Sequence, residues 1–119
     1  MSWVGETGNL WRFGDDIQPG WSSVLANYRE DNALDPAAHA GPGRWNDADM
    51  LLAGTAGASP IEQQSQCSLW AELASPLLLS ADLGSLSPQA IAMLSNQDVI
   101  AVGQDPRGHR DGSCTATPT

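Results

Sequence analysis

Two short stretches of this sequence combine residue types that could perform acid–base chemistry on a polar substrate. In the first, Arg12 stands close to the neighbouring carboxylates Asp15 and Asp16, with Gly14 marking a turn. Paired carboxylates beside a cation can differ in how tightly they hold a proton, and a general acid must keep its proton near neutral pH. Taken alone, the same pattern also fits an ordinary solvated turn.

The second stretch runs from Gly41 to Leu52 and begins as a Gly/Pro turn. It contains an aromatic ring, an amide, two carboxylates and a thioether: Trp45, Asn46, Asp47, Asp49 and Met50. Because Asp47 and Asp49 are two residues apart, an extended backbone would point both carboxylates to one face. This mixture suits the rim of a polar, sugar-sized pocket better than a hydrophobic core.

The Asp47-x-Asp49 spacing also resembles the start of a calcium-binding loop. The later positions do not fit that loop, because Met50 and Leu51 occupy positions that need an oxygen ligand or glycine. Ala58 stands where a bidentate Glu belongs. A calcium site is therefore not expected here.

The cysteines indicate neither a disulfide framework nor a metal centre. Cys67 and Cys114 are far apart, and Cys67 falls in a helical pattern that favours a buried small hydrophobe. His109 and Cys114 could share a metal ion, but two ligands are a weak signal. The sequence lacks a phosphate-cradling Gly loop, a Gly-x-Ser-x-Gly elbow and a zinc motif, so no cofactor is expected.

The elements that would position these stretches alternate between strands and helices. A short strand is expected over 10–13, ahead of the first carboxylates, and a second within 41–52. Between them, an amphipathic helix is predicted because four large residues recur with helical spacing: Trp21, Val24, Leu25 and Tyr28.

The second part of the chain continues the alternation. Ser59-Pro60 with Glu62 predicts a capped helix, whose core face is expected to hold Cys67, Trp70, Ala71 and Ala74. A buried strand follows over 77–80, then a helix from Ser87-Pro88 with Ala90, Ile91 and Leu94 in the core, and a buried strand over 98–102. Residues 103–119 are polar and expected to be loose. The order predicts a parallel α/β architecture.

Composition excludes several classes of partner. The formal net charge is −9, and all five cationic residues are Arg. A surface of this sign, without a basic stripe, argues against nucleic acid and against anionic membranes, but is compatible with neutral sugars. The longest apolar run, 76–79, is far too short to span a bilayer, and no signal peptide is visible at the start of the sequence.

Several motifs, taken in order, resemble the alpha-galactosidase (melibiase) family of retaining glycoside hydrolases, glycoside hydrolase family 27. The resemblance runs from about residue 3 to residue 108. It implies α/β architecture as part of a (β/α)8 barrel, about its last three β/α units. The motifs are Trp11-Arg12 with Asp16-Ile17, Gly41–Leu51, Leu69-Trp70, Ser75–Leu78, Leu94–Asn96 and Asp98–Pro106.

The resemblance implies a role for each matching residue. Asp16 corresponds to the general acid/base, and Arg12 to an arginine that binds sugar and steadies the catalytic carboxylates. Asp49 and Met50 correspond to residues that line the sugar pocket, whereas Asn46–Asp47 brace the loop. The family has Gly directly before its catalytic Asp, but here Asp15 occupies that position. Asp15 therefore remains a rival for the acid/base, and its bulk could disturb the turn.

The resemblance also implies that much of the barrel is missing. Residues 1–108 match the C-terminal half of the catalytic barrel and 109–119 form a loose polar tail, whereas a whole barrel takes ~250 residues. The family's nucleophile, an Asp in a Lys-Tyr-Asp setting, has no counterpart, because the sequence contains no Lys. Glu6, Glu72 and Asp82 are conceivable replacements, but nothing favours any of them.

We therefore expect a fragment of an alpha-galactosidase that is inactive alone and needs the missing N-terminal half of the barrel. Its substrate would be a small carbohydrate, an α-galactoside, with α-N-acetylgalactosaminides also open within the family. The full-length protein would be secreted or extracellular. The alternative is a non-catalytic sugar-binding or complementing module; an unrelated acidic α/β domain is a remote third interpretation.

Overall fold

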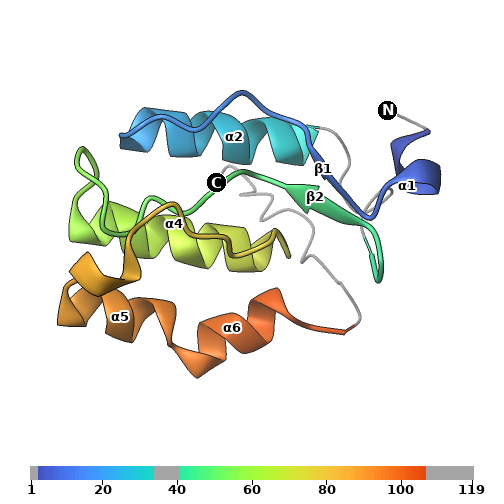
Figure 1. The fold of residues 1–119 in the computed structure, drawn as a ribbon. Coiled ribbons are helices and arrows are strands. Elements are labelled where there is room, and N and C mark those ends of the chain that lie inside the picture. The colour runs from blue at the N-terminus through green and yellow to red at the C-terminus, as the bar shows by residue number, and fades with distance from the viewer. Residues whose placement is uncertain (1–2, 34–40, 107–119) are drawn as a thin grey trace, which may run out of the picture.

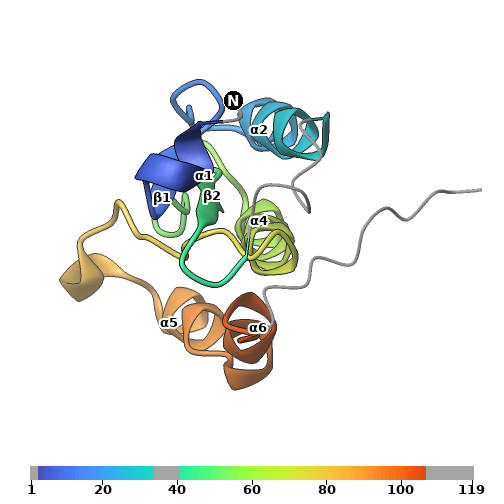
Figure 2. The ribbon, with the colours of Figure 1, turned by 90° about the vertical axis from the view of Figure 1, so that its right-hand side faces the viewer.

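The computed structural model describes residues 3–33 and 41–106. In that part of the chain the helices α2, α4 and α6 lie in a row along one side of the strands (Figure 1, Figure 2). The elements are α1 (Val4–Thr7), β1 (Leu10–Arg12), α2 (Trp21–Ala33), β2 (Trp45–Asp47), α4 (Pro60–Glu72), the 3-10 turn η1 (Leu83–Ser85), α5 (Pro88–Leu94) and α6 (Gln97–Gly103).

Strands β1 and β2 form a parallel pair that connects the two chemistry-bearing stretches. The register sets Arg12 opposite Asp47, the last residue of each strand. Because the strands are parallel, the loops that follow them open at the same edge of the sheet. The predicted strand over 10–13 and the parallel α/β architecture are thereby confirmed.

The predicted helix starts are confirmed with their capping residues. The Ser59 hydroxyl accepts the Glu62 N–H, and the Glu62 carboxylate accepts the Ser59 N–H at 2.7 Å, which completes a capping box with Pro60 in the first turn. Ser87 caps α5 through its side chain alone, which accepts the Ala90 N–H at 3.1 Å, with Pro88 in the first turn. Local signals alone therefore set where these helices begin.

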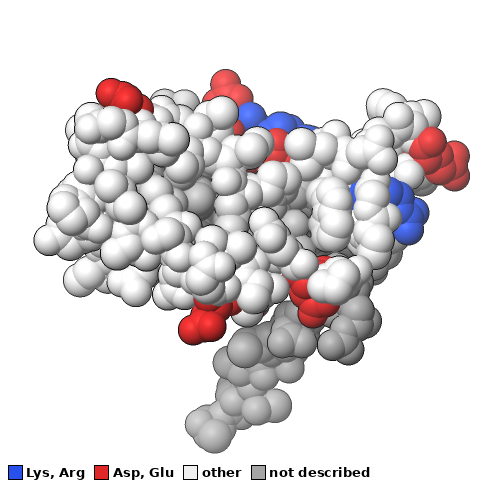
Figure 3. All heavy atoms as spheres, turned by 60° about the horizontal axis from the view of Figure 1, so that its bottom comes forward, with Lys and Arg blue, Asp and Glu red and all other residues white. Residues whose placement is uncertain are grey.

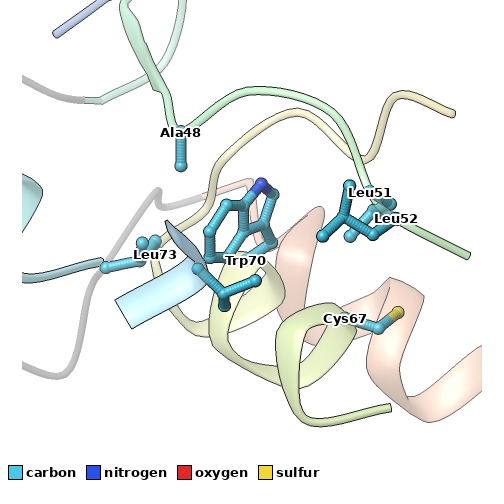
Figure 4. Close-up of a cluster of buried hydrophobic side chains, with 7 residues drawn as sticks. Ala48, Leu51, Leu52, Cys67, Trp70 and Leu73 are labelled. Carbon is cyan, nitrogen blue, oxygen red and sulfur yellow. The ribbon is translucent and has the colours of Figure 1, made fainter. Parts of the chain in front are cut away.

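The core lies between α2, α4 and the segment that follows β2. Trp70 is fully buried at its centre (Figure 4). The predicted core face of α4 is confirmed for Cys67, Trp70 and Ala71, whereas Ala74 is buried but lies beyond the helix, which ends at Glu72. Burial raises the pKa of the Cys67 thiol, because desolvation disfavours the thiolate. The buried cluster consists of Val24, Ala48, Leu51, Leu52, Cys67, Trp70 and Leu73.

The strand predicted over 98–102 is wrong, because these residues lie in the helix α6. The Asn96 side chain accepts the N–H groups of Asp98 and Val99 at 3.0 and 3.4 Å, which begins the helix. None of its residues is buried, and Val102 is 58% exposed. A short apolar run was thus interpreted as a strand although it carries a helix cap.

The buried strand predicted over 77–80 is also wrong in extent and burial. Only Leu79 makes a parallel bridge, to Leu51, and the Leu51 N–H donates to Leu78 O at 2.8 Å. Leu78 is 46% exposed, and Ile91, expected in the core of α5, is 49% exposed. These apolar side chains are exposed because no described element covers them.

No helix in the described ranges is both long and apolar enough to cross a membrane. Within the same ranges, no group of three His, Cys, Asp or Glu side chains is arranged to hold a metal ion. The expected tail over 109–119, with His109 and Cys114, lies outside the described residues, as does the expected boundary at residue 108.

Candidate active site

The guanidinium of Arg12 joins the two loops that follow β1 and β2. Its Nη2 lies 3.1 Å from Asp16 Oδ1 and 3.0 Å from Asp49 Oδ2. The same nitrogen also donates to Asp15 O at 2.9 Å, within its own loop. The structure therefore brings together Arg12, Asp16 and Asp49, residues from both stretches singled out in the sequence.

Asp49 is the most constrained residue of this cluster. Its φ of 79° is left-handed, a conformation that non-glycine residues adopt at a cost. Oδ2 accepts the Ile17 N–H at 2.7 Å, and Oδ1 accepts the Met50 N–H at 2.8 Å. The Asp49 N–H donates to Asp47 Oδ1 at 2.9 Å. Asp49 thus fixes the backbone of Ile17, the residue next to Asp16, as well as the turn formed by Asp49 and Met50.

Buried polar side chains hold the segment from Ala48 to Leu52, which lies beyond the paired part of β2. The indole N–H of Trp70 donates to Asp49 O at 2.6 Å. The Gln66 amide donates to Met50 O at 3.1 Å and accepts the Leu52 N–H at 2.8 Å. These bonds replace the ladder hydrogen bonds that a longer strand would make.

Two further buried side chains bind Ala48. The Ser75 hydroxyl accepts its N–H at 2.9 Å, and Asn27 Nδ2 donates to its carbonyl at 3.1 Å. Sequence reasoning treated Trp70 as a core residue only and missed the polar roles of Asn27, Gln66 and Ser75. A signal existed for two of them, because Asn27 and Gln66 stand at helical spacing from the buried apolar residues Val24 and Trp70.

The acidic residues differ strongly in exposure. The side chain of Asp16 is 88% exposed and that of Asp49 only 14%. Met50 is 40% exposed beside them. In the described part of the chain the Asp15 carboxylate makes no hydrogen bond or ion pair; only its backbone carbonyl is used. An exposed carboxylate beside a cation can bind a polar ligand and exchange a proton with it.

Asn46 and Asp47 serve the scaffold in different ways. Asn46 is 4% exposed and donates to Asp31 Oδ1 on α2 at 3.1 Å, pointing away from the Arg12 cluster. Asp47 accepts the Asp49 N–H. Neither Glu72 nor Asp82 makes a hydrogen bond or ion pair with the cluster among the described residues, and Asp82 instead caps η1.

Comparison with known proteins gives a consistent result. Residues 1–105 match the family model described as Alpha galactosidase A. The alpha-N-acetylgalactosaminidase of Gallus gallus is 46% identical over 109 residues, which cover 88% of this chain and 26% of the relative. The alpha-galactosidase of Oryza sativa is 45% identical over 107 residues, covering 90% of this chain and 25% of the relative.

A solved structure points to the same group. A chain from Bacteroides fragilis that bears the name alpha-galactosidase/melibiase superposes with a TM-score of 0.85 at 32% identity, covering 92% of this chain and 26% of that one. The present chain thus spans about a quarter of the length of the relatives it matches.

Proposed function

Because the chain belongs to the Alpha galactosidase A family of glycoside hydrolases, we propose that it provides the acid–base side of a retaining site for terminal α-galactosyl groups. One observation supports this most strongly: Arg12 is within 3.1 Å of the exposed Asp16 and 3.0 Å of Asp49. The three side chains stand where two parallel strands end, the edge at which barrel enzymes place their chemistry.

In this proposal Asp16 protonates the leaving glycosidic oxygen and later takes a proton from the water that releases the sugar. Arg12 stabilises the carboxylate that Asp16 becomes after it gives up its proton. Retention needs a second carboxylate ~5–5.5 Å away as the nucleophile. That residue is proposed to come from a barrel segment with no counterpart in this sequence.

Asp16 is better positioned than Asp15 for this role on two grounds. Arg12 pairs with the Asp16 carboxylate, whereas it binds only the backbone carbonyl of Asp15. Ile17, the next residue, packs against the core and is fixed by Asp49, so the direction of Asp16 is constrained. The φ of Asp15 is not left-handed, so a non-glycine residue fits this turn.

Asp49 and Met50 are proposed to line the sugar pocket. Asp49 Oδ2 accepts the Ile17 N–H and pairs with the Arg12 guanidinium, whereas Oδ1 accepts only the Met50 N–H among the described residues. Since a carboxylate oxygen has two acceptor positions, Oδ1 keeps one for a sugar hydroxyl. Met50 offers an exposed apolar surface against the sugar ring.

We also propose that these elements are the last part of a (β/α)8 barrel, with residues 1–108 as the barrel portion. The supporting features are two parallel strands, the parallel bridge from Leu51 to Leu79 and a row of helices on one side. The outer edges of such a partial sheet would need neighbouring strands. The whole protein would be secreted or extracellular, as the resemblance implies.

The test rejoins this chain to the rest of a barrel. The chain alone should not hydrolyse p-nitrophenyl α-galactoside. Residues 3–106 are then inserted into the Oryza sativa alpha-galactosidase in place of its matching segment, and this hybrid, the rice graft, should hydrolyse it. Asp16→Asn in the graft should lower kcat on an unactivated disaccharide by about 10²–10⁴-fold. Azide should restore turnover of the aryl galactoside, because a small anion can attack the intermediate without a general base.

The matched control is Asp15→Asn, which should retain activity within a few-fold. The proposal is wrong if the Asp16→Asn graft keeps full activity, or if Asp15→Asn produces the azide-rescued defect instead. The graft's preference between α-galactosides and α-N-acetylgalactosaminides would reflect the host protein. The graft therefore tests the role of Asp16 and does not decide between these two substrates.

A non-catalytic sugar-binding module is the second candidate. It is supported by the open acceptor of Asp49 next to the Arg12 guanidinium in a chain that has no Lys-Tyr-Asp motif. In that case the isolated chain binds galactose in calorimetry, and Arg12→Ala and Asp49→Ala both abolish the heat. Absence of heat for the unaltered chain would exclude this function.

A further inference from the structure

Asn27, on the inner face of α2, connects the two loops of the candidate site. It is only 3% exposed. Its Nδ2 lies 3.2 Å from Asp15 O and 3.1 Å from Ala48 O. An amide nitrogen has two N–H donors, so one can bind each carbonyl. We infer that Asn27 is a positioning residue that sets the separation of Asp16 from Asp49; its catalytic consequence rests on the proposed function.

The two carbonyls occupy equivalent places in their loops. Asp15 directly precedes Asp16, and Ala48 directly precedes Asp49. Both lie beyond the last paired residues of β1 and β2, so the sheet itself does not fix their spacing. A single buried side chain therefore ties together the residues immediately before the two site carboxylates.

Arg12 also spans the loops, but it is less suited to fixing their spacing. Its side chain is long and 35% exposed, so it can adjust when a ligand arrives. Asn27 has two side-chain torsions and lies on the same helix as the buried Val24. The short side chain therefore limits how far the loops can separate, whereas Arg12 can follow them.

Gly14 allows the first loop to approach Asn27. A Cβ atom at position 14 would lie 3.3 Å from Asn27 Oδ1 and 2.8 Å from Glu30 Oε2. Residues larger than glycine would thus push the loop away from α2 or displace the Glu30 side chain. The absence of a side chain at Gly14 therefore lets the loop lie within hydrogen-bond reach of the Asn27 amide.

The direct test measures backbone amide exchange by NMR in this chain. Asn27→Asp keeps the shape but replaces the donating NH2 group with an oxygen that faces both carbonyls, and Asn27→Ala removes the donors without adding charge. In both variants, exchange at the Ile17 and Met50 amides, which bind the Asp49 carboxylate, should rise about tenfold relative to the α4 core amides. The Ile17 amide proton should also move upfield as its hydrogen bond lengthens.

Two controls separate positioning from charge and from general stability. Asn32→Asp adds the same charge at an exposed position on the same helix. Val24→Ala loosens the packing of α2 and leaves the amide bridge intact. Neither should change the ratio of Ile17 to α4 exchange. Equal acceleration of all amides in the Asn27 variants, no acceleration, or loss of the whole fold would each overturn the positioning role.

The rice graft distinguishes this inference from the proposed function. Asn27→Ala there should lower kcat about tenfold or more and leave KM within about twofold, because misplacement affects the reacting geometry rather than sugar binding. If Asp16→Asn inactivates the graft but Asn27→Ala does not lower kcat, the inference fails alone. If the unaltered graft is inactive, the proposed function fails while the amide exchange still decides the role of Asn27.

Discussion

The loops after β1 and β2 and the helices α5 and α6 lie on different sides of α4 and are held in different ways (Figure 1, Figure 2). In the loops, side chains distant in sequence bind the backbone: Asn27, Gln66, Trp70 and Ser75. In α5 and α6, the caps come from Ser87 and Asn96, directly before each helix. Only Ala90 is buried there.

The surfaces of the two regions differ as well. The view from below α5 and α6 is largely uncharged at its centre, with acidic groups toward the margin (Figure 3). Exposed apolar side chains on these helices include Ile91 and Val102. We conclude that long-range polar contacts determine the candidate site, whereas α5 and α6 begin at local signals and pack against the core mainly through partly buried side chains such as Met93, Leu94 and Val99. The following predictions test that difference, starting from the largest expected effect.

Replacing Trp70 should produce the largest loss of stability. Trp70→Ala removes the central core side chain and should lower the free energy of unfolding by about 3–5 kcal/mol. Trp70→Phe retains most of the ring but leaves Asp49 O, now bonded at 2.6 Å, without its donor, at a cost of about 1–3 kcal/mol. Urea unfolding measures both. If Trp70→Phe is neutral, the indole hydrogen bond is not important for the site.

Replacing Gln66 tests whether buried polar side chains stabilise the segment from Ala48 to Leu52. Gln66→Met preserves volume but leaves the Leu52 N–H and Met50 O without the partners they have at 2.8 and 3.1 Å. The expected loss is about 1–3 kcal/mol, measured by urea unfolding. The control is Gln64→Met on the exposed face of α4, which should change stability by less than about 0.5 kcal/mol. Equal effects at both positions would contradict the comparison.

The same difference explains which features the sequence could reveal. The start of α4 follows from Ser59, Pro60 and Glu62 alone, since a capping box is local. The grouping of Arg12 with Asp16 and Asp49 could be anticipated only through family resemblance. The side chains that hold this group lie up to 27 residues away from the backbone they bind, and no local pattern encodes such a pairing.

The two wrong strands have one physical cause. Residues 77–80 and 98–102 are apolar runs, and a short apolar run predicts burial without specifying its conformation. In α6, the Asn96 cap and Asp98 in the first turn indicate a helix, and this signal outweighs the apolar run that follows. Burial also requires a covering element, and the sequence of the run itself cannot say whether one is present.

The capping box at the start of α4 should make a pH-dependent contribution to stability. Hydrogen bonds from the Ser59 N–H and hydroxyl lower the pKa of Glu62 from its ordinary 4.5. A lowered folded-state pKa means that this stabilisation is present above pH 4.5 and is lost as the pH falls through the lowered value. The Tm difference between the unaltered chain and Glu62→Gln should therefore shrink on acidification. A difference that grows at low pH would have the wrong sign.

The smallest effect is expected where apolar side chains remain exposed. Val102 in α6 is 58% exposed and Val24 in α2 only 1%, so one substitution can be compared at both positions. Val102→Ser removes little buried apolar surface and should change the free energy of unfolding by about 0.5 kcal/mol or less. Val24→Ser leaves a hydroxyl in the core and should cost several-fold more. Urea unfolding of the two variants measures this ratio.

A cost at Val102 equal to that at Val24 would mean that α6 belongs to the same cooperative core, and the distinction between the two regions would fail. The rice graft sharpens the comparison. If the rest of the barrel covers α6, then Val102→Ser should become more destabilising in the graft than in the chain alone, whereas Val24→Ser should cost the same in both. An unchanged ratio would mean that α6 faces solvent in the graft, because burial by another segment must increase the cost of a buried hydroxyl.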